Sequence, residues 1–180
     1  MQAAHPLLGS ICAALAAVVP SVALAGDPFR GDPTLPIPVF RGMVGPAFHI
    51  KSTQLTEFMA DVDAGFLVLT GRDQRYLLGA EAGYTFDGSG LHAFNLMAEI
   101  GGGKHFVICA AYQPRLLLGT LNEELAVGMR NGLGIHAFSD MLDVEVGHQF
   151  MESRGRLSQA VTFTIGLNPA ALIYLFILDG

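Results

Sequence analysis

The residues of this chain that could act together in catalysis lie between positions 136 and 148. Hydrolysis by nucleophilic attack needs a nucleophile, a base and an acid that orients the base. The residues of these types in that stretch are Ser139, His136, His148 and Glu145. On a β-strand, positions 136 and 139 point to opposite faces, and Ser139-Asp140 is typical of a turn. We therefore expect no enzyme, and interpret His136 as lining an interior or rim and His148 as an interfacial residue near a strand end.

The spacing of possible metal ligands predicts no metal site and no cofactor. The six histidines are scattered along the chain, without the paired spacing that zinc sites show. The glycines at 101–103 lie between two alternating segments rather than before a helix, which predicts a turn and not a phosphate-binding loop. The net charge of −6 and the lack of a basic patch exclude nucleic acid as a partner.

The charged residues are sparse and fall on one face of a two-residue alternation. They make up 14% of the chain, whereas a typical soluble domain has about 25%. If that face lies inside a narrow barrel, its charges must pair, because an isolated buried charge costs several kcal/mol. The sequence predicts an interior ion-pair network of Glu81, Glu99, Arg115, Arg130 and Glu145. The two arginines could instead contact an anionic ligand, but structural pairing is the favoured interpretation.

These residues lie in segments where large apolar residues alternate with glycine or charged residues. The clearest is 141–151, where Val144 and Val146 fall on one face and Glu145 on the other. A two-residue period is typical of a β-strand, because successive side chains point to opposite sides. Eight such segments are predicted as strands: 39–50, 58–70, 75–86, 91–100, one that begins at His105, 124–138, 141–151 and 157–167.

Turn signals separate the predicted strands. Asp87-Gly88-Ser89-Gly90 predicts a tight hairpin, because aspartate and glycine tolerate the positive φ values of such turns. Pro114 falls inside the fifth segment and lacks the amide donor that a sheet ladder needs. We therefore expect either a bulge at that position or a strand that ends at Gln113.

The N-terminus is typical of a secretory signal. Residues 7–24 are apolar and rich in alanine, and Ala23-Leu24-Ala25 offers the small residues that a signal peptidase needs. An uncleaved anchor helix is the alternative, and helix-breaking Pro20 favours cleavage near Ala25. The predicted divisions are a signal peptide (1–25), a periplasmic lead-in (26–38), a β-barrel (39–167) and a C-terminal apolar segment (168–180).

The orientation of the two faces decides between two kinds of barrel. A soluble barrel that carries a lipid turns its apolar face inward, whereas a membrane barrel turns that face toward lipid. The polar face here is mostly glycine, alanine and threonine, whereas a soluble exterior would carry many more lysines and glutamates. Apolar residues reach 51% of the chain, and after Leu24 no apolar run approaches the roughly 20 residues of a membrane helix. We therefore predict a membrane barrel, with a soluble periplasmic barrel that binds a lipid or other apolar ligand as the alternative.

The C-terminal segment 168–180 differs in pattern from the strands. It opens with Asn168-Pro169, residues that are typical of a helix N-cap and first turn. We expect a short apolar helix or an extra strand, on the barrel base or the membrane surface.

Over residues 39–167 the chain resembles the small OmpA- and OmpX-type barrels of bacterial outer membranes, in strand number, alternation and signal sequence. The predicted fold class is all-β, an eight-stranded antiparallel up-and-down transmembrane barrel. The resemblance implies an outer-membrane location, a plugged lumen that conducts little, and contacts with outer-membrane lipid and the outer-membrane assembly machinery. The expected function is a structural or other membrane role. Because some barrels of this size are lipid A deacylases, a lipid A-modifying hydrolase is a less favoured alternative.

Overall fold

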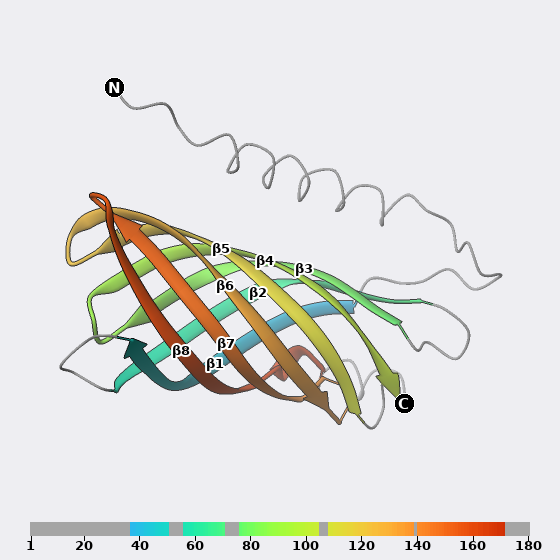
Figure 1. Ribbon diagram of the computed structural model, residues 1–180. Helices are drawn as coiled ribbons and strands as arrows, with labels where there is room; N and C mark the ends of the chain where they lie inside the picture. Colours follow the sequence, from blue (N-terminus) through green and yellow to red (C-terminus); the bar gives the residue numbers. More distant parts are fainter. Residues whose placement is uncertain (1–36, 51–55, 71–75, 105–107, 139, 172–180) are drawn as a thin grey trace. The chain divides into compact units, whose positions relative to one another are not determined.

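The computed structural model describes residues 37–50, 56–70, 76–104, 108–138 and 140–171, which contain a closed barrel of eight strands (Figure 1). The strands are β1 (Ile37–Ile50), β2 (Glu57–Thr70), β3 (Tyr76–Asp87), β4 (Leu91–Lys104), β5 (Ile108–Leu121), β6 (Glu124–Ala137), β7 (Leu142–Ser153) and β8 (Arg156–Leu167). Each strand pairs antiparallel with its neighbour in sequence, and β8 pairs with β1 to close the barrel. The predicted all-β, antiparallel, up-and-down barrel of eight strands is confirmed.

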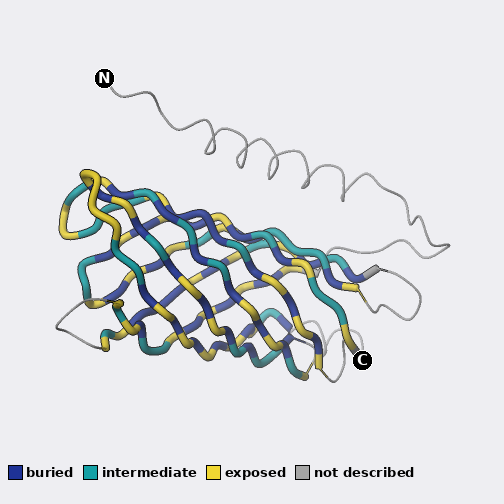
Figure 2. The backbone as a smooth tube through the Cα atoms, viewed as in Figure 1, coloured by how far each residue is buried: buried dark blue, intermediate teal, exposed yellow. Residues whose placement is uncertain are grey.

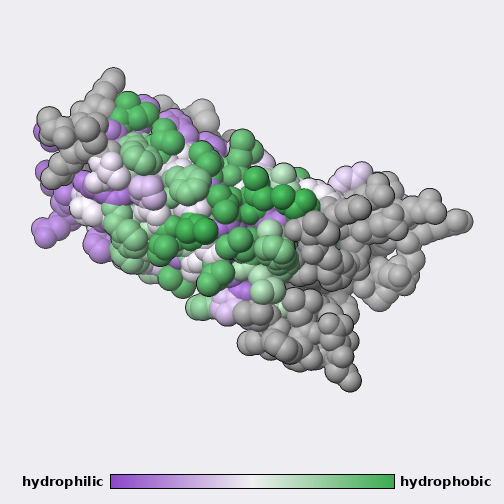
Figure 3. Space-filling model, turned by 90° about the horizontal axis from the view of Figure 1, so that it is seen from below, coloured by the Kyte–Doolittle hydropathy of each residue, from purple (hydrophilic) through white to green (hydrophobic). Residues whose placement is uncertain are grey.

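Burial alternates along the strands, so the barrel wall has two different faces (Figure 2). Large apolar side chains point outward: Phe94 is 72% exposed and Leu133 is 68% exposed. Charged side chains such as Arg115 and Glu145 point inward and are buried. Figure 3 shows apolar side chains spread over the outer surface, with hydrophilic residues gathered toward the end that carries the β7–β8 turn. This is the arrangement of faces that the sequence predicts.

The interior contains apolar clusters toward both ends of the barrel, with charged side chains between and beside them. We call the end with the β3–β4, β5–β6 and β7–β8 turns the hairpin end, and the end where β1 begins and β8 ends the terminal end. Two clusters lie toward the hairpin end, Leu91, Ala93, Leu117, Ala126 and Met151 in one and Ala47, Met59 and Ala160 in the other. A third lies toward the terminal end and contains Val39, Leu67, Leu69 and Leu77. These clusters flank the charged middle section.

Two of the turns at the hairpin end contain only two residues. Asn122 and Glu123 join β5 to β6 with φ values of 52° and 66°. Arg154 and Gly155 join β7 to β8 with φ values of 48° and 74°. Turns with two positive φ values match the right-handed twist of paired strands, so they hold the register of each hairpin.

The predicted hairpin at 87–90 is present and is held by the side chain of Asp87. Its Oδ1 accepts hydrogen bonds from the backbone N of Ser89 (2.9 Å) and of Leu91 (3.2 Å). Gly90 has a φ of 84°, a left-handed conformation that glycine adopts without strain. The aspartate therefore fixes the turn and keeps its second carboxylate oxygen for other contacts.

The prediction of a turn at 101–103 was wrong, because Gly101 and its two glycine neighbours belong to β4, which continues to Lys104. The fifth strand is described from Ile108, and its predicted start at His105 lies outside the described residues. A Cβ added at Gly101 would lie 2.5 Å from the carbonyl oxygen of Ala110 and 2.8 Å from the Cβ of Ala111. The glycine therefore allows close approach of β4 and β5 instead of forming a turn.

Neither of the structures expected at Pro114 is found. The strand continues through Pro114 to Leu121. The β4–β5 ladder pairs Met97 with Arg115 and Ile100 with Tyr112 in a single register and skips the positions between these pairs. The missing amide donor thus leaves a local gap in one ladder and causes no bulge. On its other side, β5 remains paired with β6 at Pro114.

Pro46 in β1 has the same effect on the other side of the barrel. The β1–β8 ladder pairs Val44 with Ile165 and Ala47 with Thr162, and it skips the positions between them. On its other side, Pro46 is paired with Phe58 of β2. Both prolines are therefore tolerated because the ladder on the opposite edge of the same strand is intact.

Both terminal segments extend beyond the described residues. Asn168 Oδ1 accepts a hydrogen bond from the backbone N of Ala170 (3.2 Å), and residues 169–171 are helical. The remainder of the predicted C-terminal segment, the predicted signal peptide (1–25) and nearly all of the lead-in (26–38) lie outside the described residues. No helix within the described ranges is long and apolar enough to cross a membrane.

The close approach at Gly101 gives a test of the barrel wall. We expect Gly101→Ala to lower the free energy of unfolding by about 1–3 kcal/mol, because the added methyl group must displace backbone atoms of β5. Gly42→Ala is the matched control, since a Cβ at Gly42 meets nothing within 4 Å. Thermal unfolding followed by circular dichroism measures both variants, and equal stability of the two would contradict this account of the β4–β5 contact.

Candidate functional site

The most unusual feature of the barrel is a set of charged side chains buried in its interior. Apart from Asp87 at the hairpin end, the described members are seven carboxylates and four basic residues: Asp61, Asp63, Glu81, Glu99, Asp140, Asp143, Glu145, Arg41, Arg115, Arg130 and His136. None of these residues is more than 4% exposed. Charges removed from water this completely are tolerated only when opposite charges and hydrogen bonds offset the lost hydration.

Arg115 and Arg130 form a central group with Asp61, Asp63 and Glu145. Arg115 contacts Asp63 and donates to Glu145 Oε2 at 2.9 Å. Arg130 donates to Asp61 Oδ2 at 2.6 Å, and its Nε lies 3.3 Å from Glu145 Oε1. Glu145 on β7 therefore joins the two arginines, which reach across the lumen to two carboxylates on β2.

Neutral polar side chains add hydrogen bonds to the carboxylates of the central group. Thr85 donates its hydroxyl to Asp61 Oδ1 at 2.5 Å, and Asn95 donates its amide to Asp63 Oδ1 at 2.8 Å. The Asn95 amide also lies 3.2 Å from the Thr85 hydroxyl. A buried carboxylate that accepts several hydrogen bonds is stabilised in its charged form, so these contacts support the ion pairs of the central group.

Arg41 organises a second group, toward the terminal end. Its Nε lies 2.8 Å from Asp143 Oδ2. Its Nη2 lies 3.4 Å from Glu81, 3.5 Å from Glu99 and 3.3 Å from Asp140. One guanidinium therefore faces four carboxylates, from β3, β4, β7 and the β6–β7 turn, and we call these residues with His136 the terminal-end group.

His136 is the second basic residue of the terminal-end group. Its Nε2 contacts Glu99, and its Nδ1 faces Asp140 at 2.6 Å and also contacts Asp143. Gln113 Nε2 lies 3.3 Å from the same Nε2 and 3.1 Å from Glu99. Both ring nitrogens therefore face carboxylates, a setting that favours the doubly protonated imidazolium because each N–H then has an acceptor.

Asp140 ties the β6–β7 turn to this interior. Phe138 and Asp140 have φ values of 54° and 68°, and a positive φ is unfavourable for a bulky residue such as phenylalanine. Asp140 accepts hydrogen bonds from Arg41 (3.3 Å) and from the Asn168 amide (2.8 Å). Burial would raise the pKa of Asp140, but the charge of Arg41 and the contact with His136 outweigh it and lower that pKa below its ordinary value. The ionised side chain of Asp140 thus stabilises the strained backbone conformation of the turn.

All five residues of the predicted network lie in the interior, but they pair differently from the expectation. Arg115 and Arg130 share Glu145, as the sequence prediction requires. Glu81 and Glu99, in contrast, form ion pairs with Arg41 and not with either of the predicted arginines. The predicted network is therefore divided between the central group and the terminal-end group.

The predicted network omitted several members of these groups: Arg41, Asp61, Asp63, His136, Asp140 and Asp143. Of these, His136 was expected to line the interior or its rim, but not to take part in the network. A signal for Arg41 was present, because Phe40 points outward and its neighbour in a strand must point inward. No comparable signal exists for Asp140, since it lies in a turn and its inward direction depends on the positive φ described above.

The residues considered for catalysis do not assemble among the described positions. Ser139 lies outside the described residues. His136 has carboxylate and amide partners at both ring nitrogens, and His148 is exposed on the outer face of β7. This geometry favours a structural part for His136 over that of a general base.

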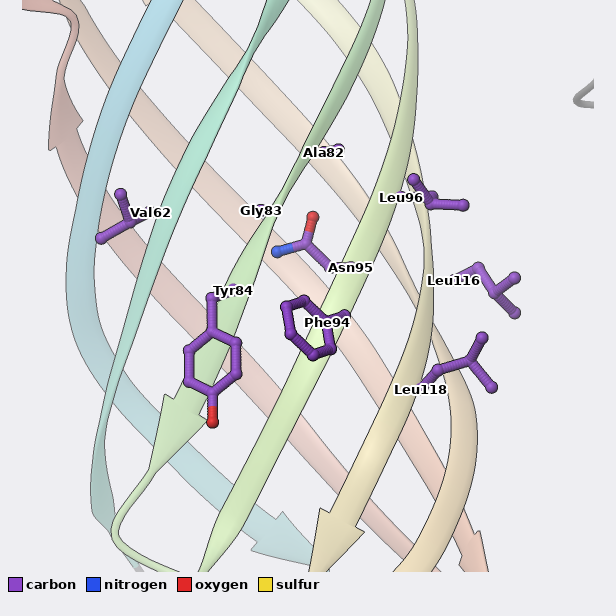
Figure 4. Close-up of a pocket in the computed structure, with 9 residues that line it drawn as sticks. All are labelled: Val62, Ala82, Gly83, Tyr84, Phe94, Asn95, Leu96, Leu116 and Leu118. Atoms are coloured by element: carbon purple, nitrogen blue, oxygen red, sulfur yellow. The ribbon is translucent and has the colours of Figure 1, made fainter.

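The outer wall carries a shallow apolar groove over β2 to β5 (Figure 4). It has a volume of about 540 Å³ and is lined by Val62, Ala82, Gly83, Tyr84, Phe94, Asn95, Leu96, Leu116 and Leu118. The rings of Tyr84 and Phe94 meet edge to face at 5.4 Å. Asn95 turns its amide inward to Asp63, so the groove presents almost only hydrocarbon and suits an acyl chain better than a polar ligand.

Comparison of the chain with protein-family models, with curated proteins and with solved structures finds no match. Its function is therefore inferred from its own residues and their geometry.

Removal of one buried arginine tests the central group. We expect Arg130→Leu to lower the free energy of unfolding by about 3–5 kcal/mol, because Asp61 loses its ion-pair partner inside the barrel. Arg154→Leu is the matched control, since Arg154 pairs with Glu124 at 2.9 Å but is 76% exposed, and we expect a change below about 1 kcal/mol. The unfolding temperature in detergent micelles measures both, and an unchanged value for Arg130→Leu would argue against a structural network.

The lowered pKa of Asp140 predicts a pH-dependent contribution to stability. An unfolded aspartate has a pKa of about 3.9, so ionised Asp140 stabilises the fold fully above that pH, and the contribution is lost as the pH falls through the lower folded value. We expect Asp140→Asn to destabilise the barrel at pH 7 by about 1–3 kcal/mol. The difference in the free energy of unfolding between Asp140→Asn and wild type should narrow below about pH 4. A difference that stays constant from pH 7 to pH 2.5 would contradict the lowered pKa of Asp140.

Proposed function

We propose that this chain is an integral β-barrel protein of a bacterial outer membrane, exported by a cleaved signal and inserted by the outer-membrane assembly machinery. Its proposed role is structural or another membrane role, carried by the apolar outer wall around an interior filled with paired charges. The observation that carries the proposal is the orientation of the faces, with charged residues inside a closed barrel and large apolar residues outside. Water could not solvate that exterior favourably, whereas lipid can.

The closed ladder supports a membrane setting for the wall. A strand in lipid must pair its backbone polar groups within the protein, and a barrel without a free edge meets that need. The strands contain 12 to 14 residues, more than the roughly 9–11 that a tilted spanning strand requires. The outward groove over β2 to β5 would accept an acyl chain of a surrounding lipid. The β3–β4, β5–β6 and β7–β8 turns are short, so among the described residues the wall is the main surface for contacts.

A soluble periplasmic barrel that binds an apolar ligand fits the geometry less well. Such a barrel needs an apolar cavity, but the middle of the described interior is occupied by the central group and the terminal-end group. It would also expose Phe58, Phe66 and Phe94 to water, each of them more than half exposed. A lipid A-modifying hydrolase is supported still less, because the ring nitrogens of His136 already face carboxylates.

Fractionation of cells that express the full chain tests the location. We expect the protein in the outer membrane, with a shift in gel mobility between heated and unheated samples, because a folded barrel resists detergent until it is heated. Recovery in the soluble periplasm without detergent would overturn the proposal and favour the ligand-binding alternative. An unchanged lipid A profile on expression would separately exclude the hydrolase.

A charged residue introduced on the outer wall tests whether lipid or water surrounds the barrel. We expect Leu133→Arg, which alters a residue that is 68% exposed within β6, to destabilise the membrane-inserted barrel by about 2–4 kcal/mol. Leu125→Arg is the matched control, since Leu125 is 83% exposed but lies at the start of β6, where a charge costs about 0–1 kcal/mol. Equal, small effects of both substitutions on unfolding in lipid bilayers would argue for an aqueous exterior.

A further inference from the structure

Three residues with metal-ligating side chains meet inside the hairpin end of the barrel. They are His49 near the end of β1, Glu57 at the start of β2 and Asp87 at the end of β3. Their candidate ligand atoms, one nitrogen and two carboxylate oxygens, all lie within 4.8 Å of one another. The three strands are adjacent in the barrel, so the wall itself sets the spacing of these atoms.

Distances within this hairpin-end group are too long for hydrogen bonds. His49 Nε2 lies 3.6 Å from Glu57 Oε2 and 3.9 Å from Asp87 Oδ2, whereas N–H···O bonds span about 2.7–3.2 Å. Two ligands that each lie about 2.0–2.2 Å from a zinc ion, at a tetrahedral angle, are separated by about 3.4 Å. The observed separations are therefore closer to those of atoms that share a metal ion.

The same three atoms lack hydrogen-bond partners among the described residues. His49 Nε2, Glu57 Oε2 and Asp87 Oδ2 are each buried and without such a partner. The His49 side chain is only 8% exposed, and that of Asp87 is fully buried. Other buried polar atoms of the barrel also lack hydrogen-bond partners, but these three belong to metal-ligating side chains and converge on one point, an arrangement that favours a ligand between them.

We propose that His49, Glu57 and Asp87 bind a divalent transition-metal ion of the zinc class at the hairpin end of the barrel. An imidazole nitrogen with two carboxylate oxygens suits zinc better than calcium or magnesium, which take mostly oxygen ligands. The fixed carboxylate of Asp87 supports this, because its Oδ1 holds the turn through Ser89 and Leu91 and leaves Oδ2 in place for the metal. Three protein ligands leave at least one coordination position for water or another small ligand.

Metal binding by the purified full-length chain in detergent micelles tests the proposal. Equilibrium dialysis against ZnCl2 measures stoichiometry and affinity, and thermal unfolding measures the accompanying stabilisation. We expect one zinc ion per chain and a higher unfolding temperature with zinc, with no comparable effect of equal concentrations of CaCl2 or MgCl2. No saturable zinc binding by the wild-type chain would overturn the proposal.

Variants assign the binding to this group rather than to other histidines. We expect His49→Gln and Glu57→Gln each to weaken zinc binding at least about tenfold, since each removes one of three ligands. Asp87 is left unchanged because its loss would also disturb the turn. The matched controls are His92→Gln and His148→Gln, which alter exposed histidines and should keep the wild-type affinity.

The heat-dependent gel shift shows whether each variant folds. Because two ligand variants are used, the test remains possible if one of them does not fold. Wild-type affinity in a folded His49→Gln or Glu57→Gln variant would overturn the assignment. Loss of binding in His136→Gln with full binding in His49→Gln would also overturn it, because the metal would then lie in the terminal-end group.

Discussion

The structure depends on the mutual neutralisation of charges inside a narrow closed barrel. An eight-stranded barrel has an interior that side chains just fill, so an arginine that points inward must find its partners within the lumen. Arg130 on β6 reaches Asp61 on β2, the strand on the opposite side of the barrel. The ladder connects these two strands only through the strands between them, so the ion pair adds a direct tie across the lumen. Such ion pairs require particular residues at particular positions, whereas the outer wall requires only apolar side chains.

The wall accommodates this interior through local exceptions to ordinary strand chemistry. Gly101 lets β4 and β5 approach closely, and Pro46 and Pro114 each remove one donor from a single ladder. In an open sheet, proline is confined to edges because a missing donor breaks the pairing. In this barrel, a strand with a local gap in one ladder is still hydrogen-bonded to its other neighbour, so its register does not change.

The strands and their faces could be predicted from the sequence, because alternation is a local property that tertiary contacts do not alter here. Segment 142–153 shows this, since its inward and outward residues follow directly from the two-residue period. The ends of strands were less predictable: glycines at 101–103 have the composition of a turn, and only the nearby backbone of β5 shows why they lie in a strand. The partners inside the lumen were least predictable. Arg41 and Glu99 are far apart in sequence, and only the closed register brings them together.

The described interior has more carboxylates than basic side chains, and the ratio differs among its three groups. The central group has two arginines for three carboxylates, and neutral donors add hydrogen bonds to two of these carboxylates. The terminal-end group has four carboxylates for two basic residues, and its outermost member lies in a turn. The hairpin-end group sets two carboxylates against one histidine. Each of the three groups therefore carries an acidic surplus, which is largest in the terminal-end group. Because an unpaired buried charge is costly, a bound proton or metal ion would stabilise these groups.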